Sequence, residues 1–165
     1  EISAGLEKKM IVLGDYLADT FNTQLRLLDE MVVELKDWTI TIKPHPACNV
    51  DLQRYVNLAN TVIVSPQAKL QDVLLGHSHA FTGPSTSAAV DAYLMGLKII
   101  TLRDLQRLNL SPLRGFRGVS FVNSKQDFVK ILQQKQKKET LKDYFNLDQS
   151  LPKWRELLRF RNAGN

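Results

Sequence analysis

Short apolar runs rich in β-branched residues alternate along the chain with longer segments that carry apolar residues at helical spacing. The short runs predict six strands, at residues 10–13, 38–42, 61–64, 79–82, 98–102 and 119–122. Runs of this length between turn residues are typical of strands that are buried in a sheet.

The segments between these runs predict helices at residues 23–36, 51–58, 68–75, 86–95, 127–134 and 151–160. In the first of them, Leu28 and Val32 fall on one helical face. Asp51 is placed to cap the second helix, and Gly76 and Gly96 are placed to end the next two.

Strands that alternate with helices predict an α/β fold. We expect a three-layer α/β/α sandwich, with a parallel, Rossmann-like sheet of about six strands and right-handed crossovers. In such sheets, ligands bind outside the carboxyl ends of the strands. The loops that follow the strands are therefore where functional residues are to be sought.

The composition fits one soluble domain. The 165 residues are 44% hydrophobic and 24% charged, and no apolar run reaches the length of a membrane span. Because the chain starts at Glu1 without a signal-peptide pattern, we interpret it as part of a longer protein. The single cysteine, Cys48, excludes an internal disulfide and fits a reducing, cytoplasmic location.

The charge of the chain is uneven. Residues 1–129 contain 13 basic and 13 acidic side chains, whereas residues 130–165 contain 9 basic and 4 acidic ones. A basic end of this kind is most often a solvated helix face, but it also fits an anionic membrane surface. No basic stripe with aromatic residues is present, so we do not expect nucleic acid as a partner.

The first candidate site follows the strand at 38–42 and reads Lys43-Pro44-His45-Pro46. The flanking prolines restrict the backbone, so they present the imidazole rigidly at the carboxyl end of the sheet. There, His45 can donate a hydrogen bond to a phosphate, and Lys43 can add positive charge. The alternatives are a turn histidine without a ligand and a solvated lysine.

The second candidate site follows the strand at 79–82 and reads Gly83-Pro84-Ser85-Thr86-Ser87 at the start of a helix. The first turn of a helix exposes free N–H groups, and hydroxyl groups there add further donors for a phosphate. A single hydroxyl would only cap the helix. Three consecutive hydroxyls exceed what capping requires.

The two motifs together resemble the C-terminal, donor-binding domain of GT-B glycosyltransferases. The similarity is closest to bacterial sialyltransferases, polysialyltransferases and capsule Kdo transferases, and it extends over about residues 10–134. The resemblance implies a surface-polysaccharide enzyme whose donor is a nucleotide sugar, in particular a CMP-activated acidic sugar. It assigns nucleotide and phosphate binding to the motif residues, which are Lys43, His45, Pro46, Gly83, Pro84, Ser85, Thr86 and Ser87.

The resemblance also implies a mechanism without a metal or a further cofactor. His45 is the catalytic residue, because it hydrogen-bonds or protonates the leaving phosphate. The base that activates the glycan acceptor lies in an N-terminal domain in these families, so residues 1–165 form the C-terminal half and are expected to be inactive alone. Residues 143–165 are expected to form a C-terminal helical extension.

Other residues are weaker candidates. Asp15, after the first strand, either lines a cleft between domains or serves as a turn residue. Arg103 and Asp104, after the fifth strand, either contact the nucleotide or form a salt-bridged loop. His77 and His79 have no partners at metal-ligand spacing, so we expect no metal site. The absence of glycine-rich nucleotide loops and of an Asp-x-Asp pair disfavours NAD, ATP and metal-dependent transferase chemistry.

Four functions remain open at this point. Besides the glycosyltransferase, the motifs fit a polyol-phosphate transferase that uses a CDP-alcohol, a UDP-sugar 2-epimerase, and a non-catalytic nucleotide- or partner-binding module. The epimerase is disfavoured because no acidic cluster follows the serine-rich turn. The basic C-terminal region, with Lys135, Lys137, Lys138 and Lys142, also suggests peripheral contact with the inner face of the cytoplasmic membrane.

Overall fold

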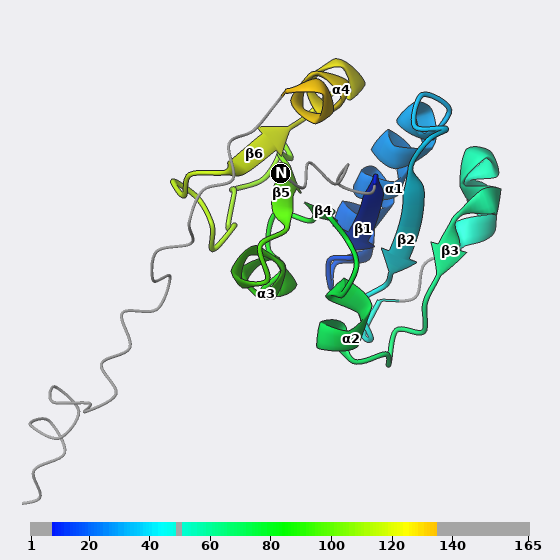
Figure 1. The fold of residues 1–165 in the computed structure, drawn as a ribbon, viewed down its shortest axis with the longest axis horizontal. Coiled ribbons are helices and arrows are strands. Elements are labelled where there is room, and N and C mark those ends of the chain that lie inside the picture. Colours follow the sequence, from blue (N-terminus) through cyan, green and yellow to red (C-terminus); the bar gives the residue numbers. More distant parts are fainter. Residues whose placement is uncertain (1–7, 49–50, 135–165) are drawn as a thin grey trace, which may run out of the picture.

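The computed structural model describes residues 8–48 and 51–134, in which six strands form one parallel sheet (Figure 1). The strand order is β3-β2-β1-β4-β5-β6. The strands are β1 Lys9–Leu13, β2 Thr39–Lys43, β3 Val62–Ile63, β4 His79–Thr82, β5 Lys98–Leu102 and β6 Val119–Val122. The predicted α/β fold with a parallel, Rossmann-like sheet is therefore confirmed.

Helices connect the strands, with bounds that differ in part from the prediction. The helices are α1 Ala18–Val32, η1 Leu52–Arg54, η2 Val56–Asn60, α2 Leu70–Leu74, α3 Ala88–Leu94 and α4 Lys125–Gln133. The prediction began α1 five residues too late, because it followed leucine spacing and missed the first turn, where Thr20 and Phe21 are buried. The predicted helix at 151–160 and the expected extension at 143–165 lie outside the described residues.

The segment at 51–58 forms two short 3₁₀ helices instead of the single helix that was predicted. Asp51 caps the first of them, as predicted, by accepting a hydrogen bond from the Gln53 N–H. The chain becomes extended at Tyr55, whose buried side chain turns toward α1 and donates a hydrogen bond of 2.8 Å to the Asn22 side chain. This tertiary contact interrupts the helix.

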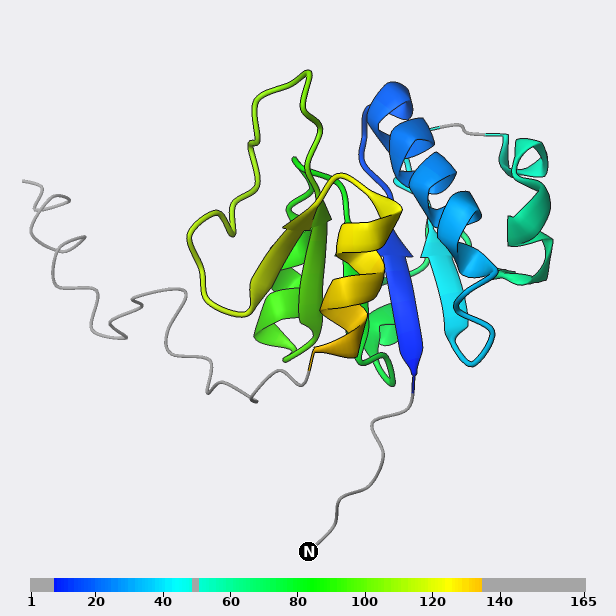
Figure 2. The same ribbon diagram turned by 90° about the horizontal axis from the view of Figure 1, so that it is seen from above.

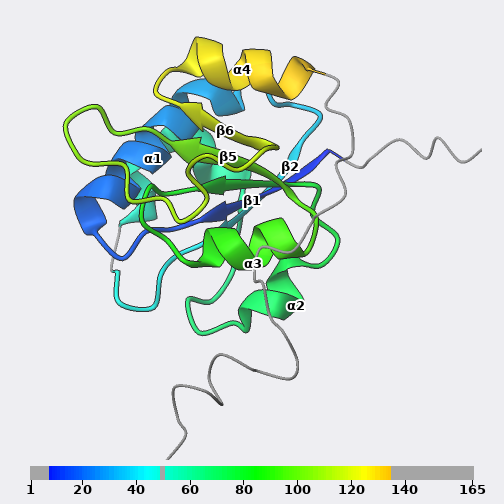
Figure 3. The ribbon, with the colours of Figure 1, turned by 90° about the vertical axis from the view of Figure 1, so that its left-hand side faces the viewer.

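Each face of the sheet is covered by its own helices (Figure 3). Alternate side chains of a strand point to opposite faces, so Val12 packs toward α1 and α4 whereas Ile11 packs toward α2 and α3. Phe81 of β4 and Phe128 of α4 are both fully buried, and their ring centroids lie 4.8 Å apart. The three layers of the predicted sandwich are thus present.

The strand order reverses between β1 and β4, which are neighbours at the centre of the sheet. Gln24 of α1 is fully buried at this place, and its amide nitrogen donates to the carbonyls of Leu13 and Phe81, at 3.3 and 2.9 Å. One side chain therefore bridges the two central strands where they end. Ligand sites of open parallel sheets lie outside such a reversal point.

Candidate functional site

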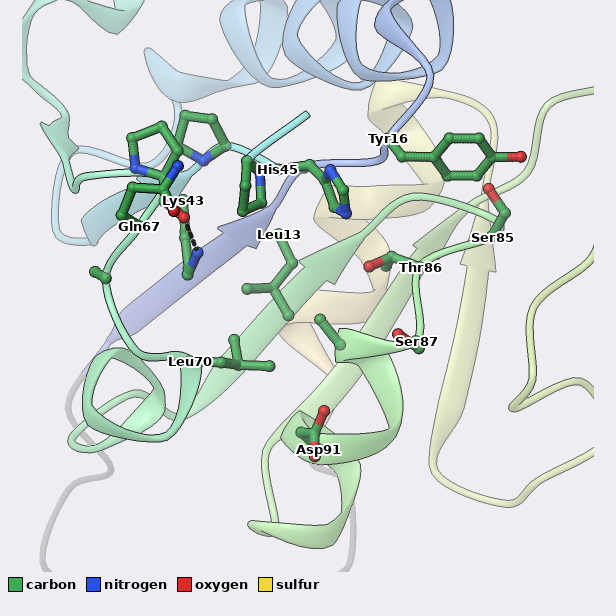
Figure 4. A pocket seen from close by; sticks show the side chains of 16 residues that line it. Leu13, Tyr16, Lys43, His45, Gln67, Leu70, Ser85, Thr86, Ser87 and Asp91 are labelled. Carbon is green, nitrogen blue, oxygen red and sulfur yellow. Dashed lines mark hydrogen bonds between the residues drawn. The ribbon is translucent and has the colours of Figure 1, made fainter. Parts of the chain in front are cut away.

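A pocket of about 390 Å³ opens at the carboxyl edge of the sheet, beside the reversal point (Figure 4). The loops that follow β1, β2, β3 and β4 all contribute to it. Its polar side chains belong to Tyr16, Lys43, His45, Gln67, Ser85, Thr86, Ser87 and Asp91. Residues 43–46 and 85–87 of the two predicted motifs, which are about forty positions apart in the chain, therefore line the same pocket, whereas Gly83 and Pro84 of the second motif do not.

His45 stands at the rim of the pocket with one ring nitrogen already engaged. The Ala47 N–H donates to Nδ1 of His45 over 3.1 Å, so a neutral imidazole carries its proton on Nε2. Tyr16 makes an edge contact with the ring, with a centroid distance of 6.4 Å. The turn thus fixes both the tautomer and the orientation of His45, and it leaves Nε2 as the hydrogen-bond donor.

Lys43 is not the solvated lysine of the alternative interpretation, since only 8% of its surface is exposed. Its ammonium donates to the carbonyl of Pro66 over 3.0 Å, and no described carboxylate forms an ion pair with it. Burial lowers the pKa of Lys43 because desolvation disfavours the charged form. The structure therefore places a partly buried ammonium at the wall of the pocket.

Asp15 does not line the pocket, because it is fully buried beneath the loop that follows β4. One of its carboxylate oxygens accepts from the Leu17 N–H at 3.2 Å. The other accepts from both the N–H and the hydroxyl of Ser85, at 3.2 and 2.6 Å. Asp15 therefore fixes the loop after β4 from the end of β1 and lies inside the fold, away from any open cleft.

Gly83 is required by this arrangement. A Cβ atom at position 83 would lie 2.6 Å from a carboxylate oxygen of Asp15, which is closer than real contacts allow.

Because the Ser85 hydroxyl already donates its proton to Asp15, it is not free to donate to a phosphate. The predicted donor set at residues 85–87 is thereby reduced to Thr86 and Ser87.

Thr86 and Ser87 both line the pocket, and they differ in exposure. Thr86 is buried, whereas Ser87 is exposed at the start of α3, where its side chain makes no capping hydrogen bond. The capping interpretation therefore does not describe Ser87. Figure 4 shows both side chains below the His45 ring and Ser85 turned away toward the side of Tyr16.

Arg103 and Asp104 line a different cavity, of about 520 Å³, between the start of α1 and the loop after β5. Asp104 forms an ion pair with Arg107 at 3.6 Å, and Arg107 also contacts Asp19 at 3.4 Å. For Asp104 this network agrees with the salt-bridged loop, which was one of the two interpretations, whereas Arg103 has no carboxylate partner among the described residues. It does not bring them into the pocket of His45.

Tyr16, Gln67 and Asp91 also line the pocket, although no motif in the sequence singled them out. Tyr16 and Gln67 lie in loops after β1 and β3, so the rule that ligands bind at carboxyl ends would have found them. Asp91 lies one turn into α3 and is exposed. Its carboxylate adds a negative charge to the rim opposite Lys43.

His77 and His79 lie at the opposite, amino-terminal edge of the sheet. Among the described residues, no group of three or more histidine, cysteine or acidic side chains could hold a metal ion.

Burial, with a contribution from Asp15, raises the pKa of the Cys48 thiol, which disfavours a thiolate nucleophile. In the described ranges, no helix is long and apolar enough to cross a membrane.

Comparisons with known proteins find similarity among solved structures. No protein-family model matches the chain, and no curated protein matches it in sequence. Among solved structures, the chain is similar to the crystal structure of the glycotransferase of kitacinnamycin, with a TM-score of 0.56 and 17% identity. The match covers 82% of this chain and 37% of that one, so this chain spans little more than a third of its neighbour's length.

The fold and the pocket define an α/β domain with a Rossmann-like sheet and a polar pocket beside its reversal point. The structural match adds that this fold is similar to part of the glycotransferase of kitacinnamycin. At 17% identity the likeness concerns the fold, so the ligand must be argued from the pocket itself.

Proposed function

We propose that this chain binds a nucleotide-activated sugar as the donor-binding domain of a glycosyltransferase. The observation that carries the proposal is the meeting of Lys43, His45 and the free hydroxyl groups of Thr86 and Ser87 around one pocket. A buried ammonium, an Nε2–H donor and two hydroxyls form a donor-rich wall, which suits the oxygens of a phosphate. The glycosyltransferase-like fold supports the same conclusion.

The chemistry that this wall favours is stabilisation of a leaving group. In sugar transfer, the bond between the anomeric carbon and the phosphate oxygen breaks, and its electron pair stays on that oxygen. The Nε2–H of His45 would donate to the oxygen as negative charge develops there, and Lys43 would stabilise that charge electrostatically. The acceptor hydroxyl must lose its proton to a base, which we place in a further domain.

We further propose that the donor is a CMP-activated acidic sugar used in surface-polysaccharide synthesis. This finer proposal is supported by the resemblance of Lys43-Pro44-His45-Pro46 and of the turn at 83–87 to the motifs of sialyltransferases and Kdo transferases. A glycan would then be the acceptor. No metal or other cofactor enters this mechanism.

Amide chemical shifts of the 165-residue chain during titration with CMP, CDP, UDP and inorganic phosphate provide the test. We expect CMP to perturb the amides of His45, Thr86 and Ser87 more than phosphate alone does. His45→Ala should weaken these changes at least about tenfold, since a hydrogen bond to a charged group is lost. His77→Gln, which changes a histidine at the opposite edge, is the control and should leave them intact.

The comparison among CMP, CDP and UDP separates the proposal of a CMP-activated donor from the more general proposal of a nucleotide-activated donor. Equal responses to CMP, CDP and UDP would retain a nucleotide site but remove the preference for CMP. If no nucleotide perturbs the pocket at millimolar concentration, the donor-binding role is wrong, and a partner-binding module becomes the better interpretation.

A further inference from the structure

The loop between β5 and β6, residues 103–118, carries three leucines that point into solvent. Leu105, Leu108 and Leu110 are 70, 82 and 65% exposed, and they lie within six consecutive positions. Single exposed leucines are ordinary on protein surfaces, but a close group of them marks an interaction surface. We call residues 105–110 the leucine loop.

The leucine loop is held in place by the part of the chain that follows it. Leu113 is fully buried in the core between the sheet and the helices α2 and α3. Its N–H donates to the Ser111 hydroxyl at 3.3 Å. On the other side, Arg107 contacts Asp19 of α1 at 3.4 Å. The fold therefore holds the loop at Arg107 and at the residues that follow it, while its leucines remain exposed.

Positive charge surrounds these leucines. Residues 103–118 contain four arginines and one carboxylate, that of Asp104. Arg107 is neutralised by Asp104 and Asp19, whereas Arg103, Arg114 and Arg117 have no carboxylate partner among the described residues. The loop that bears the leucines therefore carries an excess of positive charge.

We propose that the leucine loop inserts into the interface of a membrane that contains anionic lipid. Figure 2 shows the first part of the loop, which follows β5, projecting past the carboxyl ends of the strands before the chain runs back to the start of β6. Exposed leucines suit the soft boundary between headgroups and acyl chains, while the arginines of the loop suit anionic headgroups. A protein partner would instead have to offer a surface that is both apolar and acidic.

Insertion of the leucine loop would orient the domain with the carboxyl edge of its sheet toward the lipid surface. The carboxyl edge of the sheet bears both the leucine loop and the pocket of His45, so insertion would bring the mouth of the pocket close to the lipid surface (Figure 2). This inference differs from contact through the lysines at 135–142, which lie in another part of the chain. It is also independent of the donor proposal, because no phosphate-binding residue enters it.

Co-sedimentation of the 165-residue chain with lipid vesicles tests the proposal. The chain should bind vesicles of phosphatidylcholine with about 30% phosphatidylglycerol and bind pure phosphatidylcholine at least about tenfold more weakly. Changing Leu105, Leu108 and Leu110 together to serine should reduce binding at least about tenfold, because the apolar anchors are lost. The matched control changes the exposed residues Leu75, Leu94 and Met95 to serine and should bind like the unchanged chain.

The depth of the loop gives a second measurement. A fluorescent label on Leu108→Cys, in a Cys48→Ala background, should shift to shorter wavelength with vesicles and be quenched by brominated lipid. The same label on Leu75→Cys should show neither effect. Vesicle binding that survives the loop substitutions, or that is lost only when the lysines at 135–142 are changed to glutamine, overturns the proposal. Absence of vesicle binding by the unchanged chain overturns it as well, and a protein partner for the loop is then the better interpretation.

Discussion

At the scale of single residues, Lys43 combines burial with the lack of a described carboxylate partner. A lysine kept for stability would be paired with an acidic group, because an isolated buried charge opposes folding. The arrangement is better explained by an anionic ligand that completes the site. The burial of Lys43 depends on the loop at Pro66, after β3, and so it could not be predicted from the residues next to Lys43.

Lys43→Met should therefore separate binding from stability. We expect the free energy of unfolding, measured in urea, to stay unchanged or to rise, since a desolvated charge is replaced by an apolar chain of similar length. Affinity for CMP, measured by amide shifts, should fall about tenfold or more. Lys69→Met, at an exposed lysine near the pocket, should change neither quantity. A large loss of stability with intact binding would assign Lys43 a structural role.

Unlike Lys43, Asp15 is assigned a structural role, because its carboxylate accepts hydrogen bonds from Leu17 and Ser85 and does not line the pocket. Asp15→Ala leaves the Leu17 N–H and the N–H and hydroxyl of Ser85 without an acceptor. Unsatisfied buried donors are costly, so we expect a loss of about 2–4 kcal/mol in the free energy of unfolding. The control is Asp37→Ala, an exposed carboxylate paired with Lys8 at 3.4 Å, whose loss should cost less than about 1 kcal/mol. Equal effects of the two substitutions would contradict the role of Asp15.

At the scale of elements, the sequence predicted strands better than helix ends. Three strands, β4, β5 and β6, have the predicted bounds, and the others differ by one residue at one or both ends. Buried strands appear in the sequence as continuous apolar runs. The ends of such a run mark closely where the strand begins and ends. The helix α1 and the segment at 51–58 differ from the prediction because tertiary contacts, such as that of Tyr55 with Asn22, decide where those helices begin and end.

The start of α3 allows the two interpretations of its serine to be tested. Ser87→Ala should leave the free energy of unfolding within about 0.5 kcal/mol, because the Ser87 side chain makes no capping bond. The matched control is Ser124→Ala at the start of α4, where the hydroxyl does accept from the Asp127 N–H at 3.2 Å. That substitution should cost about 1 kcal/mol. CMP affinity should fall for Ser87→Ala alone. If Ser87→Ala destabilises the chain as much as the control does, the serine is a cap.

At the scale of the whole molecule, the parallel sheet and the edge that bears the site could be predicted from the sequence. Alternating elements imply the layers, and the position of ligand sites at carboxyl ends brings the loops of β2 and β4 together. The link between Asp15 and Ser85 could not be predicted, because the two residues are 70 positions apart and meet only once β1 and β4 are neighbours. That link removes Ser85 from the expected donors.

The two edges of the sheet also differ in their chemistry, and the amino-terminal edge makes the stability of the molecule depend on pH. There, His79 is buried against Trp38, with a ring-centroid distance of 4.8 Å, and burial together with the charge of Lys98 lowers the pKa of His79 to about 4. In the unfolded chain, a histidine has a pKa near 6.5. Between these values the unfolded state binds more protons, so folding is favoured above pH 6.5 and loses stability as the pH falls toward 4.

We therefore expect the free energy of unfolding to fall by on the order of 2 kcal/mol through His79 alone between about pH 7 and pH 4.5. His79→Phe keeps a ring against Trp38 but cannot titrate, so its urea-unfolding curves should show a smaller decrease over that range. Ser78→Ala retains the histidine, although it removes the 2.9 Å contact with Nδ1, and it should keep most of the pH dependence. Proton NMR of the His79 ring should show no titration above about pH 5. Identical pH dependence in His79→Phe and the unchanged chain would mean that this histidine does not couple folding to pH.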